Sequence, residues 1–318
     1  MASKYGGLAF STYPIRRHRP PSPIFRPVTL PDMSQWELPL EGFGVRVREA
    51  GEGEPILCLH GGPGMDSGYF FPDAAVWGPG LRALAADHRV VTYDQRGCGG
   101  SGVPDVDQPL ALSRHVDDVE QVRAALGLER PTVLAHSFGS VLAILFALQH
   151  PDRLSRLVIT GGAPTREFMS GYRRAVAAEL TSEIRHRLVG IQAGEIDDEA
   201  MRERFRLALP LYFHRSLSDL EAESLLSTIS FSATVNRAVA AGLDRYDLSP
   251  ALPHIRVPAL VIYGASDRVV QPEYQLEFRG RLLTARFVAF QESGHFPFLE
   301  EPEPFARVVH YFVRHADR

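Results

Sequence analysis

Three side chains that could together perform acyl transfer lie just after strand-like segments of the sequence. Ser137 lies in the stretch AHSFGS, after the β-branched run PTVLA and before the apolar run VLAILFALQH. Asp267 ends the segment VIYGASD, and His295 lies in SGHFPF, after the run ARFVAFQE. Because a serine hydroxyl is a weak nucleophile, it needs a base to accept its proton and a carboxylate to orient that base. The order serine, aspartate, histidine, each after a predicted strand, therefore indicates a catalytic triad.

The residues around Ser137 are typical of a sharp turn from a strand into a helix. In such a turn the residues two before and two after the serine must be small, and here they are Ala135 and Gly139. Glycine is usual at both positions, so Ala135 departs from the pattern by one methyl group. The turn would expose the hydroxyl at the carboxyl edge of a sheet, next to a helix N-terminus that favours negative charge. Taken singly, Ser137 could equally cap a helix, Asp267 could be a turn residue and His295 a solvated loop histidine.

Acyl transfer also needs backbone N–H donors for the developing oxyanion. One donor is the amide of Phe138, directly after Ser137. The loop HGGPG at 60–64 follows another strand-like run, and its glycines allow the backbone to approach a substrate closely. We predict the second donor at Gly62, with Gly61 as the alternative, and we expect His60 to be a structural hydrogen-bonding residue. Chemistry of this kind requires neither a metal ion nor an organic cofactor.

The composition of the chain argues against several other functions. The 34 basic and 38 acidic residues are well mixed and give a net charge of −4, so we expect neither a nucleic-acid partner nor a membrane partner. The only lysine is Lys4, which excludes Schiff-base chemistry, pyridoxal phosphate attachment and a Walker-type phosphate loop. Cys58 and Cys98 form neither a disulfide framework nor a metal-binding spacing. We therefore expect a cytoplasmic protein that acts on a small molecule or a short peptide; its oligomeric state is open.

Apolar strands that alternate with amphipathic helices must position these residues. After a hairpin around EGFG, strands are expected in ILCLH, HRVVTYDQR, PTVLAH, RLVITGG, VPALVIYG and ARFVAFQE. Helices are expected near 74–86 and at 113–126, the second capped by Ser113 and ended by Gly127. This alternation predicts an α/β protein with a mostly parallel, twisted sheet and helices on both faces.

Between about residues 164 and 249 the strand pattern stops and helical spacing takes over. We predict a helical cap (lid) at 164–249, inserted after the sixth strand over the ligand edge of a core formed by 34–163 and 250–318; a separate helical domain is the alternative. Residues 1–33 contain six prolines and predict an extended or disordered N-terminal arm.

Several of these segments together resemble the α/β-hydrolase superfamily. The resemblance covers roughly residues 34 to 314 and is carried by HGGPG, YDQRGCGGS (93–101), the turn at Ser137, GASD and SGH. The pair LHGGPG and DQRGCG is similar in particular to the proline iminopeptidases, which are serine peptidases. The resemblance implies an α/β-hydrolase fold and hydrolysis of an amide or ester bond of a small substrate through an acyl-enzyme. It also implies a triad of Ser137, Asp267 and His295.

The chain departs from the proline iminopeptidases where those enzymes hold the free amino group of a peptide. The family uses acidic residues there, whereas the matching positions here are Arg237, after Asn236, and Arg268, after Asp267. The turn reads AHSFG where the family usually has Gly-Gly-Ser-Trp-Gly, and the predicted cap contains no tryptophan. Two arginines would repel an ammonium group and favour a carboxylate or another anion. We therefore predict Arg237 and Arg268 as substrate-binding residues, with surface salt bridges as the alternative.

The same triad can serve several reactions, because the cap and the pocket select the substrate. The candidates are an aminopeptidase that releases an N-terminal residue, a carboxylesterase or lactonase, a hydrolase of carbon–carbon bonds, and an acyltransferase if the cap excludes water. A candidate of another class is a low-turnover, ligand-sensing protein that retains the fold. A probe that reacts with an activated serine separates the enzymes from the sensor.

Overall fold

The computed structural model describes residues 30–193, 196–244 and 246–316. The predicted N-terminal arm, residues 1–33, lies outside the described residues except for residues 30–33.

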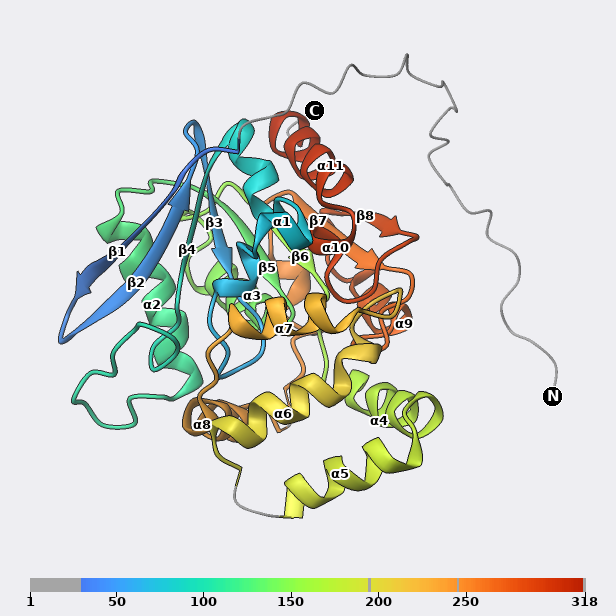
Figure 1. The fold of residues 1–318 in the computed structure, drawn as a ribbon. Coiled ribbons are helices and arrows are strands. Elements are labelled where there is room, and N and C mark those ends of the chain that lie inside the picture. The colour runs from blue at the N-terminus through green and yellow to red at the C-terminus, as the bar shows by residue number, and fades with distance from the viewer. Residues whose placement is uncertain (1–29, 194–195, 245, 317–318) are drawn as a thin grey trace, which may run out of the picture.

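Eight strands form one sheet in the order β1-β2-β4-β3-β5-β6-β7-β8. β2 pairs antiparallel with β1 and β4, and all other neighbours are parallel (Figure 1). The strands are β1 (Met33–Leu40), β2 (Phe43–Ala50), β3 (Glu54–Leu59), β4 (His88–Tyr93), β5 (Thr132–His136), β6 (Arg156–Thr160), β7 (Ala259–Gly264) and β8 (Ala285–Phe290). This arrangement confirms the predicted α/β architecture.

The strand side chains alternate between the two faces of the sheet, as the two-residue period of a strand requires. In β3, Leu57 and Leu59 belong to one hydrophobic cluster, whereas Ile56 and Cys58 belong to another. Because both faces are buried, the central strands read as continuous apolar runs. Full burial of an aliphatic side chain contributes about 1.5–3 kcal/mol, so these two clusters hold the sheet in place.

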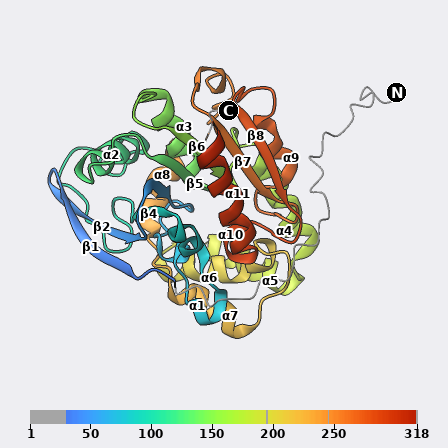
Figure 2. The ribbon, with the colours of Figure 1, turned by 90° about the horizontal axis from the view of Figure 1, so that it is seen from above.

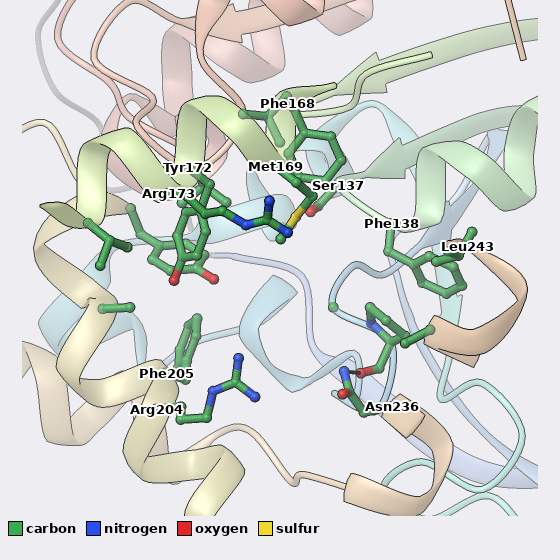
Figure 3. A pocket seen from close by; sticks show the side chains of 18 of the residues that line it. Ser137, Phe138, Phe168, Met169, Tyr172, Arg173, Arg204, Phe205, Asn236 and Leu243 are labelled. Atoms are coloured by element: carbon green, nitrogen blue, oxygen red, sulfur yellow. Dashed lines mark hydrogen bonds between the residues drawn. The ribbon is translucent and has the colours of Figure 1, made fainter. Parts of the chain in front are cut away.

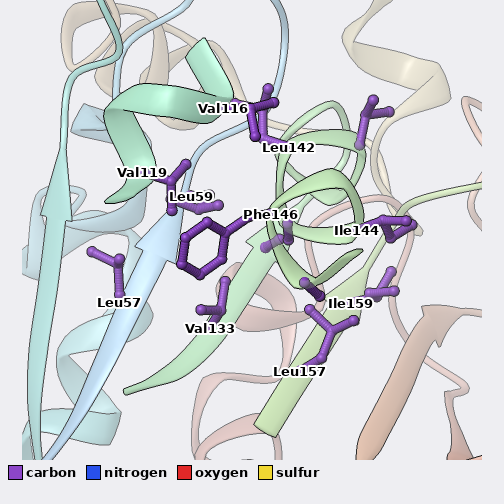
Figure 4. Close-up of a cluster of buried hydrophobic side chains, with 14 of the residues drawn as sticks. Leu57, Leu59, Val116, Val119, Val133, Leu142, Ile144, Phe146, Leu157 and Ile159 are labelled. Atoms are coloured by element: carbon purple, nitrogen blue, oxygen red, sulfur yellow. The ribbon is translucent and has the colours of Figure 1, made fainter. Parts of the chain in front are cut away.

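Helices cover both faces of the sheet. On one face, α2 (Leu112–Ala125) and α3 (Gly139–Gln149) pack on the strands, and Phe146 lies at the centre of their contact (Figure 4). On the other face lie α11 (Pro302–His315) and the 3-10 helix η2 (Gly80–Ala86). The view from above shows α2 and α3 on one side of the sheet and α11 on the opposite side (Figure 2). The shorter elements are η1 (Gly68–Phe70), α1 (Ala74–Trp77), η4 (Leu252–His254), α9 (Pro272–Gln275), η5 (Leu276–Phe278) and α10 (Pro297–Glu300).

Two predicted helices differ in detail from the structure. The helix expected near 74–86 is interrupted between α1 and η2, because Gly78 and Gly80 have φ values of +73° and +55°, which a right-handed helix cannot contain. The helix expected at 113–126 begins at Leu112, and its N-cap residue, Ala111, makes no side-chain capping bond. Ser113 therefore lies within the first turn and does not cap the helix.

The described residues between β6 and β7 form helices that gather at one end of the molecule (Figure 1). They are α4 (Phe168–Glu179), α5 (Ser182–Ala193), α6 (Asp198–Ala208), η3 (Leu209–Leu211), α7 (Asp219–Ser227) and α8 (Ala233–Gly242). The helical insertion after the sixth strand is therefore present, and its division into a cap at 164–249 and a core at 34–163 and 250–318 is our proposal. No helix within the described residues is long and apolar enough to cross a membrane.

Gly264, the last residue of β7, allows this strand to pass close to the loop that precedes His295. A Cβ atom on Gly264 would lie 1.9 Å from Gly294 O and 2.4 Å from Ser293 O. Because both are backbone atoms, we expect Gly264→Ala to lower the free energy of unfolding by at least about 1–3 kcal/mol, measured by denaturant unfolding. Gly190→Ala in α5 is the control, since nothing lies within 4 Å of that position and alanine favours a helix. Equal effects of the two substitutions would contradict the prediction.

Candidate active site

Ser137 occupies the turn between β5 and α3 in a strained backbone conformation. Its φ is +53°, in a region that residues other than glycine rarely adopt. Its amide donates to Thr160 O at 2.8 Å, and its carbonyl accepts from the amide of Ser140 at 2.9 Å. A Cβ atom on Gly139 would lie 2.3 Å from Leu59 O, so only glycine fits where β3 passes the start of α3. The structure thus contains the strand-to-helix turn that the sequence predicts.

The alanine two residues before the serine fits this turn. Ala135 is fully buried and pairs in the sheet with Leu59 and Ile159. Its methyl group belongs to the hydrophobic cluster under α2 and α3, which explains how the turn accommodates one methyl group in place of glycine.

Asp267 and His295 lie in the loops after β7 and β8, and their side chains are hydrogen-bonded. His295 Nδ1 lies 2.7 Å from Asp267 Oδ2, and each residue is only 2% exposed. Asp267 Oδ1 accepts from the amides of Val269 and Val270, both at 2.9 Å, and Oδ2 also accepts from Gln275 Nε2 at 2.9 Å. These donors fix the carboxylate. A carboxylate in this position favours the imidazole tautomer with a proton on Nδ1 and a free Nε2.

His295 reaches the same edge of the sheet as Ser137. Its ring contacts that of His136, the residue before Ser137, with the centroids 4.7 Å apart. Gly161, after β6, has a φ of +63°, and a Cβ atom there would lie 3.0 Å from His295 Cε1. In the part of the chain that the structure describes, Ser137 Oγ makes no hydrogen bond to His295. A bond between nucleophile and base is often loose until a substrate binds.

The amides near Ser137 differ in their availability to a ligand. The Gly61 N–H donates to Tyr69 Oη at 2.5 Å. The amides of Gly62 and Phe138 have no partner among the described residues, and both residues line a cavity with Ser137. Of the amides of Gly61, Gly62 and Phe138, the last two are therefore without a hydrogen-bond partner among the described residues.

A directed chain of hydrogen bonds links the glycine loop to the histidine loop. Because Tyr69 Oη accepts the Gly61 N–H, its own O–H donates to His136 Nδ1, at 2.9 Å. His136 Nε2 then carries the proton and donates to His295 O at 3.0 Å. Burial, followed by the nearby His295, holds the pKa of His136 well below its usual range, so this imidazole is neutral. Sequence reasoning assigned no role to His136 or Tyr69.

His60 has the structural role expected for it. Its Nε2 accepts from the Gln95 amide at 3.0 Å, and its Nδ1 donates to Gly61 O at 3.0 Å. Burial lowers the pKa of His60 to about 4, and the residue is fully buried. A neutral histidine with both nitrogens engaged supports the glycine loop and is not free to act as a base.

The cap helices contact the loops that carry these groups. Asn236 Nδ2 in α8 donates to Pro63 O at 2.7 Å, and the Ser232 amide donates to Gly64 O at 2.6 Å. The His295 amide donates to Tyr212 O, directly after η3, also at 2.6 Å. The cap is therefore bonded to both the glycine loop and the histidine loop, and its packing influences the position of each.

A cavity of about 750 Å³ lies between the sheet edge and the cap. Ser137 and Phe138 face it from the core, and α4 and α6 contribute Phe168, Met169, Tyr172 and Phe205 (Figure 3). Its size and mainly apolar walls are typical of a site for a small molecule.

Arg237 and Arg268, the predicted substrate-binding pair, do not line this cavity. Asn236 and Ala240 face the cavity from α8, whereas Arg237 lies one position farther around the helix and is exposed. Arg268 Nε pairs with Glu179 Oε2 at 2.5 Å, and its Nη1 donates to Phe213 O at 3.1 Å. The structure therefore gives Arg268 the salt-bridging role that was the alternative, and it does not bring either arginine together with Ser137.

Two other arginines, Arg173 in α4 and Arg204 in α6, point into the cavity (Figure 3). Sequence reasoning missed both, although a signal was present. In α6, Met201, Phe205 and Ala208 share the helix face of Arg204, and an arginine within an apolar face is unusual for a surface helix.

Comparisons with known proteins show the family to which this fold belongs. Residues 54–302, more than half of the chain, match the family model described as alpha/beta hydrolase fold. The chain is 26% identical over 277 residues to a proline iminopeptidase of Heyndrickxia coagulans, covering 83% of this chain and 92% of that protein. It is 28% identical over 292 residues to a 2-hydroxymuconate semialdehyde hydrolase of Pseudomonas sp. strain CF600, covering 88% and 94%.

The fold is also found in solved structures. The crystal structure of a proline iminopeptidase from Mycobacterium smegmatis is similar with a TM-score of 0.68 and 25% identity, covering 89% of this chain and 99% of that chain. The resemblance carried by the sequence motifs is thus confirmed. The chain belongs to the α/β-hydrolase fold family.

Proposed function

We propose that the protein is a serine hydrolase that cleaves an ester or amide bond of a small substrate through an acyl-enzyme. The observation that carries this proposal is the buried hydrogen bond of 2.7 Å between His295 and Asp267, at the sheet edge where Ser137 faces a cavity. Membership of the α/β-hydrolase fold family supports a hydrolytic reaction. Ser137 is the proposed nucleophile, His295 the general base and acid, and Asp267 the residue that orients His295.

In the first half of the proposed reaction, Ser137 Oγ attacks the substrate carbonyl carbon while His295 Nε2 takes its proton. The carbonyl oxygen becomes an oxyanion, which accepts hydrogen bonds from the amides of Gly62 and Phe138. Each such donor typically lowers the barrier by about 3–4 kcal/mol. The carbon–leaving-group bond then breaks, and the imidazolium returns the proton to the leaving group, which leaves an acyl-enzyme on Ser137.

In the second half, water repeats these steps on the acyl-enzyme. His295 removes a proton from the water as it attacks, and the second oxyanion uses the same two amides. Collapse of this intermediate breaks the bond to Ser137 Oγ, which recovers its proton from the imidazolium. Asp267 remains ionised throughout and keeps Nδ1 protonated, so Nε2 can both accept and release the proton.

A panel of small substrates tests this function on the purified protein. It contains p-nitrophenyl esters, lactones, N-blocked amides and prolyl-naphthylamide. We expect the highest kcat/KM on an ester or on an amide without a free amino group, because no aspartate or glutamate among the described residues lines the cavity to hold an ammonium. Selective release of unblocked N-terminal proline would contradict this expectation and indicate an aminopeptidase.

Hydrolysis of a carbon–carbon bond is a second candidate. It is supported by the similarity over 88% of the chain to a 2-hydroxymuconate semialdehyde hydrolase, and the same three residues would serve it. Turnover of a 2-hydroxymuconate semialdehyde by the purified protein, followed by the loss of its absorbance, would favour this candidate over ester hydrolysis.

Tyr69 is expected to act as a positioning residue. Tyr69→Phe removes the hydroxyl that accepts the Gly61 N–H and donates to His136. This leaves a buried amide without a partner, at a cost of about 1–3 kcal/mol, and frees both the glycine loop and the histidine loop to shift. We expect a lower melting temperature and a roughly 10-fold lower kcat, since small misplacements of catalytic groups are costly.

Tyr93→Phe is the matched control for this substitution. Tyr93 is also buried, but its hydroxyl has no hydrogen-bond partner among the described residues. Its removal should leave kcat unchanged. If Tyr69→Phe keeps full kcat while folded, the chain from Gly61 to His295 does not position the catalytic groups.

A further inference from the structure

Positively charged side chains line the cavity, and the carboxylate that pairs with one of them lies outside the lining. Among the described residues, no aspartate or glutamate lines the cavity, whereas the guanidinium groups of Arg166, Arg173, Arg185 and Arg204 do. Because an arginine in a protein does not lose its proton, each of these charges needs a partner or water.

Two of the four arginines are already satisfied by the protein. Arg166 Nη1 pairs with Asp244 Oδ1 at 2.7 Å. Arg185 Nη1 donates to the carbonyl oxygens of Ala177 and Leu180, at 2.8 and 2.6 Å, near the end of α4. These contacts hold the cap helices together and leave no need for a ligand.

Arg173 and Arg204 differ from that pair, because neither has an ion pair or hydrogen bond with a described residue. Arg173 extends from α4 and Arg204 from α6, and both point into the same space (Figure 3). Burial raises the pKa of Tyr172 and of Tyr212, and the positive charge of Arg204 acts on both phenols in the opposite direction. The charge of Arg204 therefore acts on cavity-lining side chains.

The wall around these two guanidinium groups is mainly apolar; Arg204 is partly buried, and Arg173 is exposed. Phe168, Met169 and Val176 line it from α4, and Met201 and Phe205 line it from α6. A guanidinium group binds a carboxylate through two parallel N–H···O bonds, which are stronger than hydrogen bonds between neutral groups. An apolar wall with such groups suits a ligand that has a hydrophobic body and an anionic end.

We infer that the cavity binds a substrate with a carboxylate, which Arg173 and Arg204 hold while its hydrophobic body lies against α4 and α6. The position of the bond to be cleaved, next to Ser137, rests on the proposed function; the binding of the carboxylate does not. The same positive charge opposes the ammonium group of a peptide with a free N-terminus.

Binding of two matched, non-hydrolysable ligands tests this inference. Calorimetric titration of the full chain at low salt compares 6-phenylhexanoate with 6-phenylhexanamide, which differ in charge but hardly in size. We expect the acid to bind at least about 10-fold more tightly, as a charge-assisted hydrogen bond predicts. In the double variant Arg173→Gln/Arg204→Gln the ratio of the two affinities should fall to about 1, so that the acid and the amide bind equally.

The matched control is Arg174→Gln/Arg202→Gln. It removes the same charge from the same two helices, but Arg174 bonds to Tyr274 Oη at 2.9 Å, Arg202 pairs with Glu223 at 3.4 Å, and neither lines the cavity. This control should keep the preference for the acid. Equal affinities of the wild type for acid and amide, absence of binding of both, or an equal loss of preference in the two double variants would overturn the inference.

Hydrolysis distinguishes this inference from the proposed function. The kcat/KM for mono-p-nitrophenyl adipate should exceed that for p-nitrophenyl hexanoate by about 10-fold in the wild type, and the ratio should fall in Arg173→Gln/Arg204→Gln. If neither ester is cleaved while the acid is still bound selectively, the carboxylate site is supported and the proposed serine chemistry is not.

Discussion

Ser137→Ala is expected to abolish turnover of any substrate that the wild type hydrolyses, with kcat reduced by about 10⁶-fold, the scale seen when a serine nucleophile is removed from other enzymes. The substitution removes the only atom of the proposed triad that bonds to the substrate, and His295 then has no proton to accept. Steady-state kinetics on the best ester of the substrate panel measures the loss. Alanine tolerates the φ of +53° no worse than serine does, so the melting temperature should remain close to that of the wild type.

Ser140→Ala is the control for this substitution. Ser140 lies three residues farther along, is fully buried, and its Oγ has no hydrogen-bond partner among the described residues. The substitution removes one hydroxyl group, as Ser137→Ala does, but from a residue that does not line the cavity. The kcat of this variant should equal that of the wild type. A Ser137→Ala protein that retains more than a hundredth of the wild-type kcat would show that another group is the nucleophile.

Asp267→Asn is expected to lower kcat by about 10⁴-fold while the protein stays folded. Asp267 Oδ2 accepts a hydrogen bond from the His295 Nδ1–H, with the two atoms 2.7 Å apart. An asparagine that turns its NH₂ group toward Nδ1 would force the proton onto Nε2, the nitrogen that must accept the proton of Ser137. The same steady-state assay measures this loss, and circular dichroism confirms that the variant is folded.

Asp118→Asn separates this effect from a general loss of buried charge. Asp118 is 1% exposed and bonds to the guanidinium group of Arg96, away from the cavity lining. Its substitution should lower the melting temperature but preserve the kcat of the folded protein. Similar values of kcat for Asp267→Asn and the wild type would contradict the proposed role of Asp267.

The sheet and the turn at Ser137 could be predicted because their signals are local. Continuous apolar runs indicate which strands are buried on both faces, and the close approach of Leu59 O to the start of α3 requires glycine at position 139. The order of the three loops along the chain then places Asp267 and His295 at the edge where the parallel strands end.

Features that depend on tertiary contacts could not be predicted in this way. Asn236 faces the cavity and Arg237 does not, because successive residues of a helix point in directions about 100° apart, and only the packing of α8 sets which of them faces inward. The orientation of the Arg268 side chain is set by its ion pair with Glu179, which lies 89 positions earlier in the chain. Tyr69 has no motif of its own, since its role arises from contacts with Gly61 and His136.

The local rules also failed where two signals competed. Ser113 has the residue type of a helix cap, but α2 begins at Leu112, with Ala111 in the capping position. The helical spacing of 74–86 was overridden by Gly78 and Gly80, whose positive φ values end α1 and reorient the chain into η2.

Mass spectrometry of the protein after reaction with a fluorophosphonate probe tests the central claim most directly. The proposal predicts a single covalent adduct on the peptide that contains Ser137, formed by the folded wild type and absent from Ser137→Ala. Folded protein that forms no adduct, or an adduct on a different serine, would contradict the claim; the first result would favour a ligand-sensing protein that retains the fold.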